Sequence, residues 1–308
     1  MDIRALQYFL AVAREGNITK AAETLHMTQP PLSRQMKELE SELGKQLLVR
    51  GSKRITLTEE GQLLQRRAEE MLELFEKTKA EINSCDAEIG GEIYIGGGET
   101  QRMLILARAA KNLQKKHPLI RFRIFSGDAD HVTERLDRGL IDFGLLVEPA
   151  DMGKYDYLRL PGKDTWGVLM RSDSPLAQKA SICPQDLWDQ PLMLSHQTAD
   201  SSEMAQWMGK DLSRLHVVVT YELAYNASRF VKAGFGYALT LDQLINTTGD
   251  ADLCFRPLSP VLESGLCVVW KKHPVFSKAC QLYLQELKEE ILRETGPDPS
   301  PPVVPTQI

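Results

Sequence analysis

The sequence has few cysteines and no long apolar run, and these two features argue against several classes of protein. None of its apolar runs reaches the ~18 residues that a membrane-spanning helix needs. Its five cysteines are scattered without a C-x-x-C pair, which argues against a disulfide framework or zinc site and fits reduced thiols. The N-terminus contains Asp2 and lacks a cleavage pattern of small residues, so it is a poor signal peptide. We therefore expect a cytoplasmic protein of 308 residues, enough for about two domains.

Motifs for catalysis, nucleotide binding and metal binding are also missing. The glycines Gly96–Gly98 lack G-x-G-x-x-G spacing and the lysine of a P-loop. His196 adjoins Ser195 and lies near Asp200, but there is no G-x-S-x-G elbow, and adjacent Ser and His on one loop cannot form the usual triad. The histidines show no metal-ligand spacing. An enzyme is therefore the disfavoured class, and the sequence predicts no catalytic residue, metal or cofactor.

Charge is distributed unevenly along the chain. The net charge is −5, which taken alone argues against a nucleic-acid partner. Residues 1–58, however, contain nine Lys and Arg against six Asp and Glu, a net charge of +3, which leaves −8 for the remainder. A basic N-terminal segment on an acidic body is typical of a DNA-binding module attached to another domain.

Residues 1–58 follow the pattern of a winged helix-turn-helix. The predicted helices are Ile3–Arg14, Lys20–Leu25 with Thr19 as its N-cap, and a third helix from the Thr28 cap to Leu43, ending at Gly44. Two short strands, Leu47–Arg50 and Ile55–Leu57, are expected around a basic turn, which together form a wing. A short helix, a tight turn and a second helix with a polar, basic start are typical of DNA binding.

The stretch TQPPLSRQMKELE, residues 28–40, places two prolines at the start of the third helix. Proline is tolerated there because the N–H groups of a first helical turn have no intrahelical partner. Leu32, Met36 and Leu39 recur at helical spacing and are expected in the core. The polar side chains can reach bases or phosphates, whereas a solvated surface is the alternative for any one of them alone. The predicted DNA contacts are Thr19, Thr28, Gln29, Pro30, Pro31, Ser33, Arg34, Lys37, Arg50, Lys53 and Arg54.

A long helix is predicted over residues 59–89. Its apolar seam keeps a heptad spacing along Leu64, Ala68, Met71, Phe75, Thr78, Ile82, Cys85 and Ile89. A single helix of this length has no intramolecular reason to keep a 3.5-residue repeat. The pattern therefore favours a dimer coil through the residues from Leu64 to Ile82, and packing on its own domain is the alternative.

Residues 90–295 alternate between strand and helix patterns, which predicts α/β structure with parallel sheets. Among the expected strands are Ile93–Ile95, Ile120–Phe125 and Phe143–Val147, and a final helix is expected over Val275–Arg293. The tail 296–308 is rich in proline and is expected to be disordered.

The N-terminal residues resemble the LysR-type transcriptional regulators. The matching residues are Phe9, Val12, Gly16, Thr19, Ala21, Ala22, Leu25, Gln29, Pro31, Ser33, Arg34, Gln35, Leu39, Glu40, Leu43, Gly44, Leu47, Arg50, Leu57, Thr58 and Gly61. That many matches at fixed spacing are far more specific than a lone helix-turn-helix pattern. Two departures are Leu48, where the family usually has Phe, and Leu241-Asp242, where Leu-Pro is common.

The resemblance covers residues 1–295 and implies a multidomain α/β architecture. It implies a winged helix-turn-helix over 1–58, a dimerisation helix over 59–89 and a periplasmic-binding-protein-like effector domain over 90–295. Crossing strands join subdomain I, residues 90–161 and 265–295, to subdomain II, residues 162–264. The implied partners are double-stranded promoter DNA, a small-molecule effector, a second copy in a homodimer or homotetramer, and RNA polymerase.

The effector is expected at the carboxyl ends of the strands, where loops and helix starts meet. The predicted contacts are Thr100, Gln101, Asp128, Trp166, Ser195, Thr198 and Ser202. Hydroxyl-bearing helix starts favour an anionic metabolite such as a carboxylate. As alternatives, Thr100 and Ser202 are plain helix caps and Trp166 is only core. A pure solute receptor leaves the first 60 residues unexplained, and a winged-helix repressor of another family lacks the two-lobed body.

Overall fold

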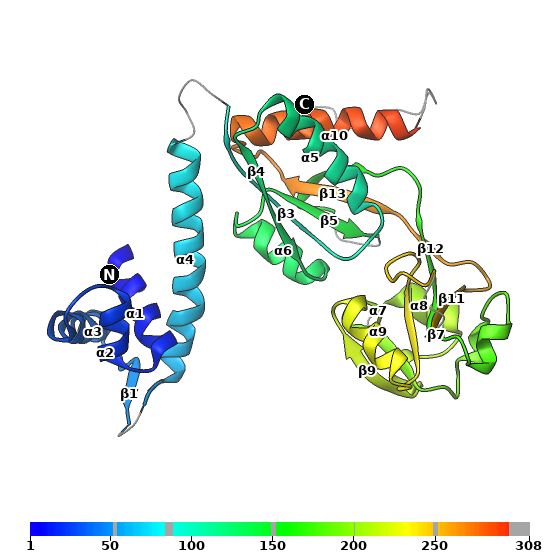
Figure 1. Ribbon diagram of the computed structural model, residues 1–308, viewed down its shortest axis with the longest axis horizontal. Coiled ribbons are helices and arrows are strands. Elements are labelled where there is room, and N and C mark those ends of the chain that lie inside the picture. Colours follow the sequence, from blue (N-terminus) through cyan, green and yellow to red (C-terminus); the bar gives the residue numbers. More distant parts are fainter. Residues whose placement is uncertain (52–53, 84–88, 149–151, 200, 249–251, 296–308) are drawn as a thin grey trace. The chain divides into compact units, whose positions relative to one another are not determined.

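The computed structural model describes residues 1–51, 54–83, 89–148, 152–199, 201–248 and 252–295. The chain divides into two compact units, Met1–Asn83 and Ser84–Ile308. Each is described by itself below, with the labels of Figure 1. The predicted tail, Lys53 and Cys85 lie outside the described residues.

The first unit is a helix-turn-helix with a wing and a long C-terminal helix. Its elements are α1 (Ile3–Glu15), α2 (Ile18–Thr24), α3 (Gln29–Leu43), β1 (Leu48–Arg50), β2 (Ile55–Leu57) and α4 (Glu59–Asn83). Leu32, Met36 and Leu39 are buried together with Phe9 and Val12, as the helical spacing predicts. β1 and β2 pair antiparallel, with Leu48 opposite Leu57. The apolar faces of α1, α2 and α3 thus meet in one core.

The start of α2 differs from its prediction by two residues. Asn17, rather than Thr19, is the N-cap, and its Oδ1 accepts hydrogen bonds from the N–H groups of Thr19 at 2.8 Å and Lys20 at 3.1 Å. Asn and Thr are both favourable caps. Gly16 adopts a left-handed conformation with φ 59° at the end of α1, and this turn places Asn17 ahead of the helix.

The long helix α4 is divided between two roles along its length. Leu64 packs against the core of the first unit, and Ala68 is fully buried. Within the single chain these two residues therefore pack on their own domain, which is the stated alternative, and their place in a dimer seam stays a prediction. Farther along, Met71, Phe75 and Ile82 are 37%, 40% and 69% exposed. In the described residues α4 ends at Asn83, and Ile89 packs on the core of the second unit instead of extending the seam.

The second unit contains two sheets, each flanked by helices. The first sheet runs in the order β4 (Ile120–Ser126), β3 (Gly91–Gly97), β5 (Phe143–Val147), β13 (Leu266–Lys271), β6 (Tyr155–Arg159). α5 (Met103–Lys116) and α10 (Lys278–Thr295) pack on one face of it, and α6 (Ala129–Asp137) packs on the other. Figure 1 shows α5 and α10 side by side above this sheet. We call this sheet and its helices lobe I.

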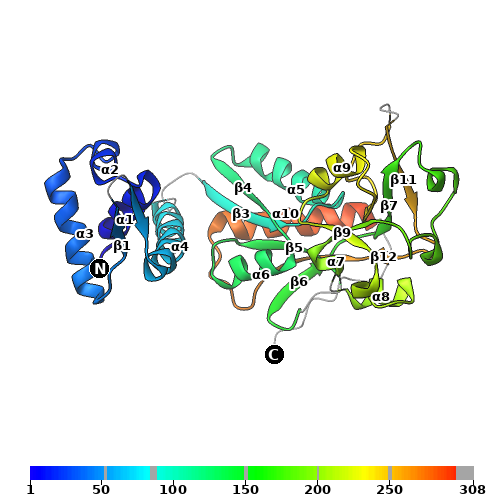
Figure 2. The same ribbon diagram turned by 90° about the horizontal axis from the view of Figure 1, so that it is seen from below.

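The second sheet runs in the order β11 (Leu253–Pro257), β7 (Asp164–Arg171), β10 (Tyr237–Leu241), β8 (Leu192–Ser195), β9 (Val217–Tyr221). β12 (Glu263–Ser264) also pairs with β7. The helices are α7 (His196–Ala199), α8 (Ser202–Met208) and α9 (Ala224–Lys232), with short 3₁₀ turns at Pro175–Gln178, Pro184–Asp186 and Leu212–Arg214. α8 and α9 cover opposite faces, as Figure 2 shows. We call this sheet and its helices lobe II.

Both sheets are mixed, which corrects the prediction of parallel sheets. β3 pairs parallel with β4 and β5, and β8 pairs parallel with β9 and β10. β13 runs antiparallel to β5 and β6, and β7 runs antiparallel to β10 and β11. The chain enters lobe II along β7 and returns to lobe I along β13. These two crossing strands run antiparallel to their neighbours in each sheet.

Phe143 lies among other aromatic rings in the core of lobe I, and removing its side chain should lower the stability of the fold. Its side chain is 0% exposed and its ring lies 5.1 Å from that of Phe276 and 5.3 Å from that of Tyr283. We expect Phe143→Ala to lower the free energy of unfolding by about 3–5 kcal/mol, because the lost ring leaves a cavity. Urea denaturation followed by circular dichroism measures this loss. Leu292→Ala, at a side chain 58% exposed, is the control and should change stability by less than about 0.5 kcal/mol.

Candidate functional site

The first turn of α3 is the most distinctive surface of the first unit. Thr28 is its N-cap in extended backbone, but the Thr28 side chain makes no capping hydrogen bond. Gln29 opens the helix, and Pro30 and Pro31 follow within the first turn. Gln29 and both prolines are exposed. The helix therefore begins with side chains facing solvent and, because two of its first three residues are prolines, with few free N–H groups, so its side chains are what can reach a phosphate or the edges of bases.

A basic and amide cluster follows on the next turn of α3. Arg34 has a side chain that is 81% exposed and donates from Nε to Glu38 at 2.8 Å. Gln35 donates to the other oxygen of the Glu38 carboxylate at 2.9 Å. Lys37 is exposed, and Ser33 is half-buried. Glu38 thus holds the Arg34 fork on the helix surface, where a pair between exposed charges is worth less than about 1 kcal/mol and yields readily to a stronger anion.

The other predicted DNA contacts are placed in part. Thr19 is exposed in the first turn of α2. Arg54 is exposed, follows the wing turn and lies against Gly16, whose carbonyl accepts the N–H of Ile55 at 2.8 Å. The wing strand therefore joins the α1–α2 corner and carries Arg54 with it. Arg50 ends β1, and its side chain, like Lys53, lies outside what the structure describes.

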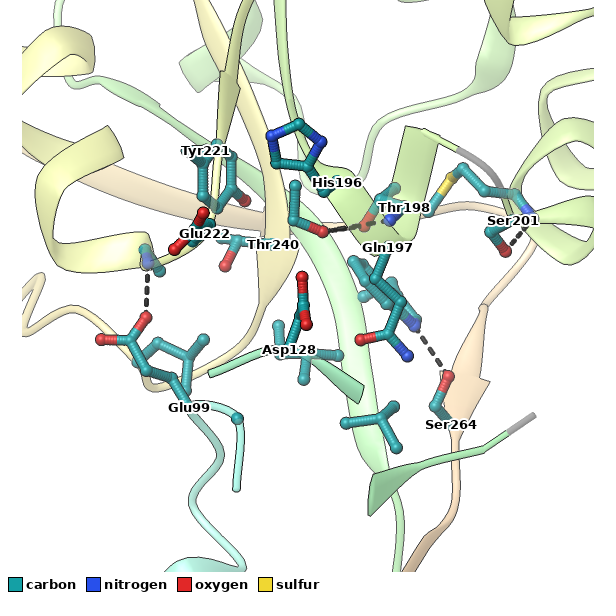
Figure 3. A pocket seen from close by; sticks show the side chains of 18 of the residues that line it. Glu99, Asp128, His196, Gln197, Thr198, Ser201, Tyr221, Glu222, Thr240 and Ser264 are labelled. Atoms are coloured by element: carbon teal, nitrogen blue, oxygen red, sulfur yellow. Dashed lines mark hydrogen bonds between the residues drawn. The ribbon is translucent and has the colours of Figure 1, made fainter. Parts of the chain in front are cut away.

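In the second unit a cavity opens between the two lobes (Figure 3). It encloses about 850 Å³ of empty space, its open mouth included. Its lining comes from the loops after β3, β4 and β5, from β7 and β10, and from the segments after β8 and β9. These are mainly the carboxyl ends of strands, where ligands of open α/β sheets are expected.

Four of the seven predicted effector contacts line this cavity. They are Asp128, Trp166, Ser195 and Thr198. The Ser195 and Thr198 hydroxyls are 2.6 Å apart, and Ser195 Oγ also accepts the Thr198 N–H at 3.1 Å. Trp166 donates its indole N–H to Ser264 Oγ at 2.9 Å. The Trp166 ring therefore has a defined hydrogen-bond partner, packs against the core of lobe II and also lines the cavity.

Thr100, Gln101 and Ser202 do not line the cavity. The Thr100 hydroxyl donates to the buried carboxylate of Asp164, so it ties lobe I to lobe II. Gln101 donates to the Gln243 carbonyl on another surface. Ser202 begins α8, but Ser201 is its N-cap and faces the cavity. Thr100 keeps part of its alternative role as a helix cap, because its hydroxyl accepts the Arg102 N–H at 3.0 Å in the turn that leads into α5.

The cavity wall contains acidic residues that the sequence argument did not name. Besides Asp128, the lining includes Glu99, Glu148, Glu203 and Glu222. Among the described lining residues there is no lysine or arginine, and His196 is the one basic side chain. The prediction of an anionic metabolite is therefore at odds with the charge of the wall. The sequence signal that was available is an acidic residue within two positions after the end of β3, β5 and β9.

Tyr221 of the cavity wall and Cys267, which contacts the wall residue Glu148, both remain uncharged at neutral pH. Burial and the neighbouring Glu148 carboxylate raise the pKa of the Cys267 thiol to about 12, and its Sγ lies 3.2 Å from Glu148 Oε1. Burial raises the pKa of the Tyr221 phenol, whose hydroxyl donates to the Leu239 carbonyl at 2.6 Å. Neither group supplies a positive charge to offset the carboxylates.

A winged helix-turn-helix with an exposed polar helix start, followed by a two-lobed α/β unit around a cavity, defines a DNA-binding regulator with a ligand-binding domain. Residues 3–62 match the family model of the bacterial regulatory helix-turn-helix protein, lysR family, and residues 86–292 match the LysR substrate binding domain. The second match alone covers more than half of the chain. The chain belongs to the LysR family of transcriptional regulators.

Individual relatives agree with this assignment. The chain is 39% identical over 143 residues to the HTH-type transcriptional regulator BsdA of Bacillus subtilis (strain 168), a match that spans 46% of this chain and about half, 49%, of BsdA. It is 28% identical over 277 residues to the Hca operon transcriptional activator HcaR of Escherichia coli (strain K12), covering 88% of this chain and 92% of HcaR. Full-length CbnR complexed with its target DNA has the same fold, with a TM-score of 0.72, 20% identity and coverage of 94% and 100%.

Proposed function

We propose that this protein binds promoter DNA through the start of α3 and responds to a small molecule held between lobes I and II. The single observation that carries the DNA-binding half is the solvent-facing first turns of α3, with Gln29, Arg34 and Lys37 exposed on a rigid core. In this proposal Arg34 and Gln29 reach base edges, and Lys37 and the wing arginines reach phosphates. The proposed contacts also include Thr19, Thr28, Pro30, Pro31 and Ser33.

Self-association is part of the same proposal. The second half of α4 presents Met71, Phe75 and Ile82 to solvent along one stripe in the single chain. Exposed apolar side chains at heptad spacing fit a second copy of the same helix. Two copies bring two α3 helices to two half-sites, and tetramers and contact with RNA polymerase extend the arrangement. Among the described residues no helix has the length and apolar character needed to cross a membrane. We propose a cytoplasmic location.

In this proposal the two-lobed domain changes its arrangement when the small molecule binds. Thr100 and Arg102 of lobe I contact Asp164 of lobe II, with Arg102 Nε 3.3 Å from Asp164 Oδ1. A ligand that contacts both lobes changes the relative free energy of their arrangements, and hence the spacing of the DNA-binding units. In this proposal Asp128, Trp166, Ser195 and Thr198 are ligand contacts.

A footprint on the DNA upstream of the protein's own gene tests the proposal. We expect protection of a region with two or more half-sites, and a shift or shortening of that region with one class of small molecule. Absence of protection at low salt, where nonspecific phosphate contacts are strongest, contradicts the DNA-binding half. A footprint that no small molecule alters contradicts the effector half.

A further inference from the structure

The charge of the cavity is contributed by both lobes. Glu99, Asp128 and Glu148 come from lobe I, and Glu203 and Glu222 come from lobe II. Glu222 is labelled across the cavity from Asp128 in Figure 3. Carboxylates only accept hydrogen bonds when ionised. An anion placed among them is repelled, and its burial without a positive partner is unfavourable.

The helix starts around the cavity are already occupied by the chain's own oxygens. Glu99 of lobe I accepts the N–H of Ala224, the first residue of α9 in lobe II. Asp128 accepts the N–H of His131 at 2.9 Å in the first turn of α6, and Ser201 accepts the N–H of Met204 at 3.2 Å in α8. Helix N–H groups are the usual anion sites of such folds. Here these N–H groups are satisfied, so an anionic ligand does not find these donors, and His196 is the one basic side chain in the described lining.

Several carboxylate oxygens remain available to a ligand. In the described part of the chain Glu203 and Glu222 have no ion-pair partner, whereas Glu148 pairs with Arg159 at 3.1 Å. No group of three or more described residues is arranged to hold a metal ion, so the acids are spread along the wall. Apolar side chains share the wall with these acids, among them Trp166, Met204 and Leu262. A wall that combines separate carboxylates with apolar surface matches an aliphatic chain that carries positive groups.

We propose that the cavity binds an organic cation, an aliphatic amine with one or more ammonium groups, a proposal that rests on the proposed effector role of this cavity. The ammonium donates three hydrogen bonds and pairs with carboxylates of both lobes. Bound there, it lowers the repulsion between Glu222 and the acids of lobe I and favours the arrangement with the lobes closest. Ser264 accepts from Trp166 and retains its own hydroxyl proton, while the Ser195–Thr198 pair supplies further oxygens.

The test compares ligands that differ only in charge. The full chain is titrated with α,ω-diamines of three to six carbons, with dicarboxylates of equal length and with diols of equal length, at constant ionic strength. We expect a diamine to raise the melting temperature at millimolar concentration and to alter the footprint, while dicarboxylates and diols do neither. If no diamine raises the melting temperature, whether or not a dicarboxylate raises it, the proposal is overturned.

A double variant separates cavity binding from effects of amines on DNA or on the protein surface. We expect Glu203→Gln with Glu222→Gln to weaken diamine binding at least 10-fold in isothermal titration without DNA, because two charge pairs are lost. Asp189→Asn, an exposed acid of lobe II that does not line the cavity, is the matched control and should bind as before. Equal weakening in both variants, or in neither, overturns the assignment.

The result also separates this proposal from the function on which it rests. If the protein protects its operator and a dicarboxylate alters that footprint, the cation proposal fails and the proposed regulator stands. If no operator is protected, the proposed function fails whatever the cavity binds.

Discussion

Replacing Arg34 by alanine is expected to abolish sequence-specific DNA binding at moderate salt while leaving the fold intact. The side chain is 81% exposed, and its one ion pair, to Glu38, lies on the same helix surface, so its removal leaves the core unchanged. A side chain that reads a base is worth about 1–3 kcal/mol for each half-site. Two half-sites make the expected loss roughly 10²-fold or more. Gel-shift titration against operator and scrambled DNA measures both affinity and preference.

Two further substitutions decide what Arg34 contacts. Arg34→Lys keeps the charge but loses the planar fork, so it restores binding if the contact is a phosphate and fails to restore preference if the contact is a guanine. Lys45→Ala removes an exposed cation just after the other end of α3, where its Nζ lies 3.4 Å from Glu60, and should keep sequence preference. Unchanged affinity and preference in Arg34→Ala would remove α3 from the proposed interface.

Charging the exposed stripe of α4 is the second change with a large expected effect. We expect Met71→Asp with Phe75→Asp to give monomers at micromolar concentration, because four facing carboxylates would replace apolar contact between two copies. Both side chains are more than a third exposed in the single chain, so each unit should fold. Loss of the dimer separates the two half-site contacts and lowers operator affinity by about 10²–10⁴-fold. Light scattering and gel shift measure the two effects.

The control for this change lies on the same helix. Glu69 is exposed, and the 100° step of an α-helix places it well away from the apolar stripe. Glu69→Gln should therefore keep the oligomeric state and the operator affinity. A dimer that persists in the doubly charged variant would mean that the chain associates through another surface.

Much of the first unit could be predicted from local pattern. The prolines at 30 and 31 fit only a first helical turn, and the positive φ of Gly44 ends α3 where expected. Leu32, Met36 and Leu39 are buried because one helix has one apolar face. The cap of α2 was missed, since Asn17 and Thr19 satisfy the same sequence rule and only the chain path after Gly16 selects between them.

The heptad seam of α4 was predicted correctly as a pattern and only partly as a surface. Periodicity shows which residues share a face, but it does not state what covers that face. α1 covers its beginning, so Ala68 is buried and Leu64 is half-buried within one chain, while Phe75 and Ile82 stay exposed. Mixed sheets were missed for a related reason, since strand patterns carry no direction.

The sequence by itself determined the kind of protein: fixed spacings around Gln29, Pro31 and Arg34 specify a DNA-binding helix, strand–helix alternation specifies an α/β body, and the family resemblance implies its two lobes. These properties depend on neighbours along the chain, where periodicity and caps act. Only the tertiary structure decided the charge of the cavity. Glu99, Glu148 and Glu222 lie far apart in sequence, and the lobes bring them to one wall. Electrostatic interaction depends on distance in space, so the sequence shows that acidic residues follow these strands but not that they share one wall.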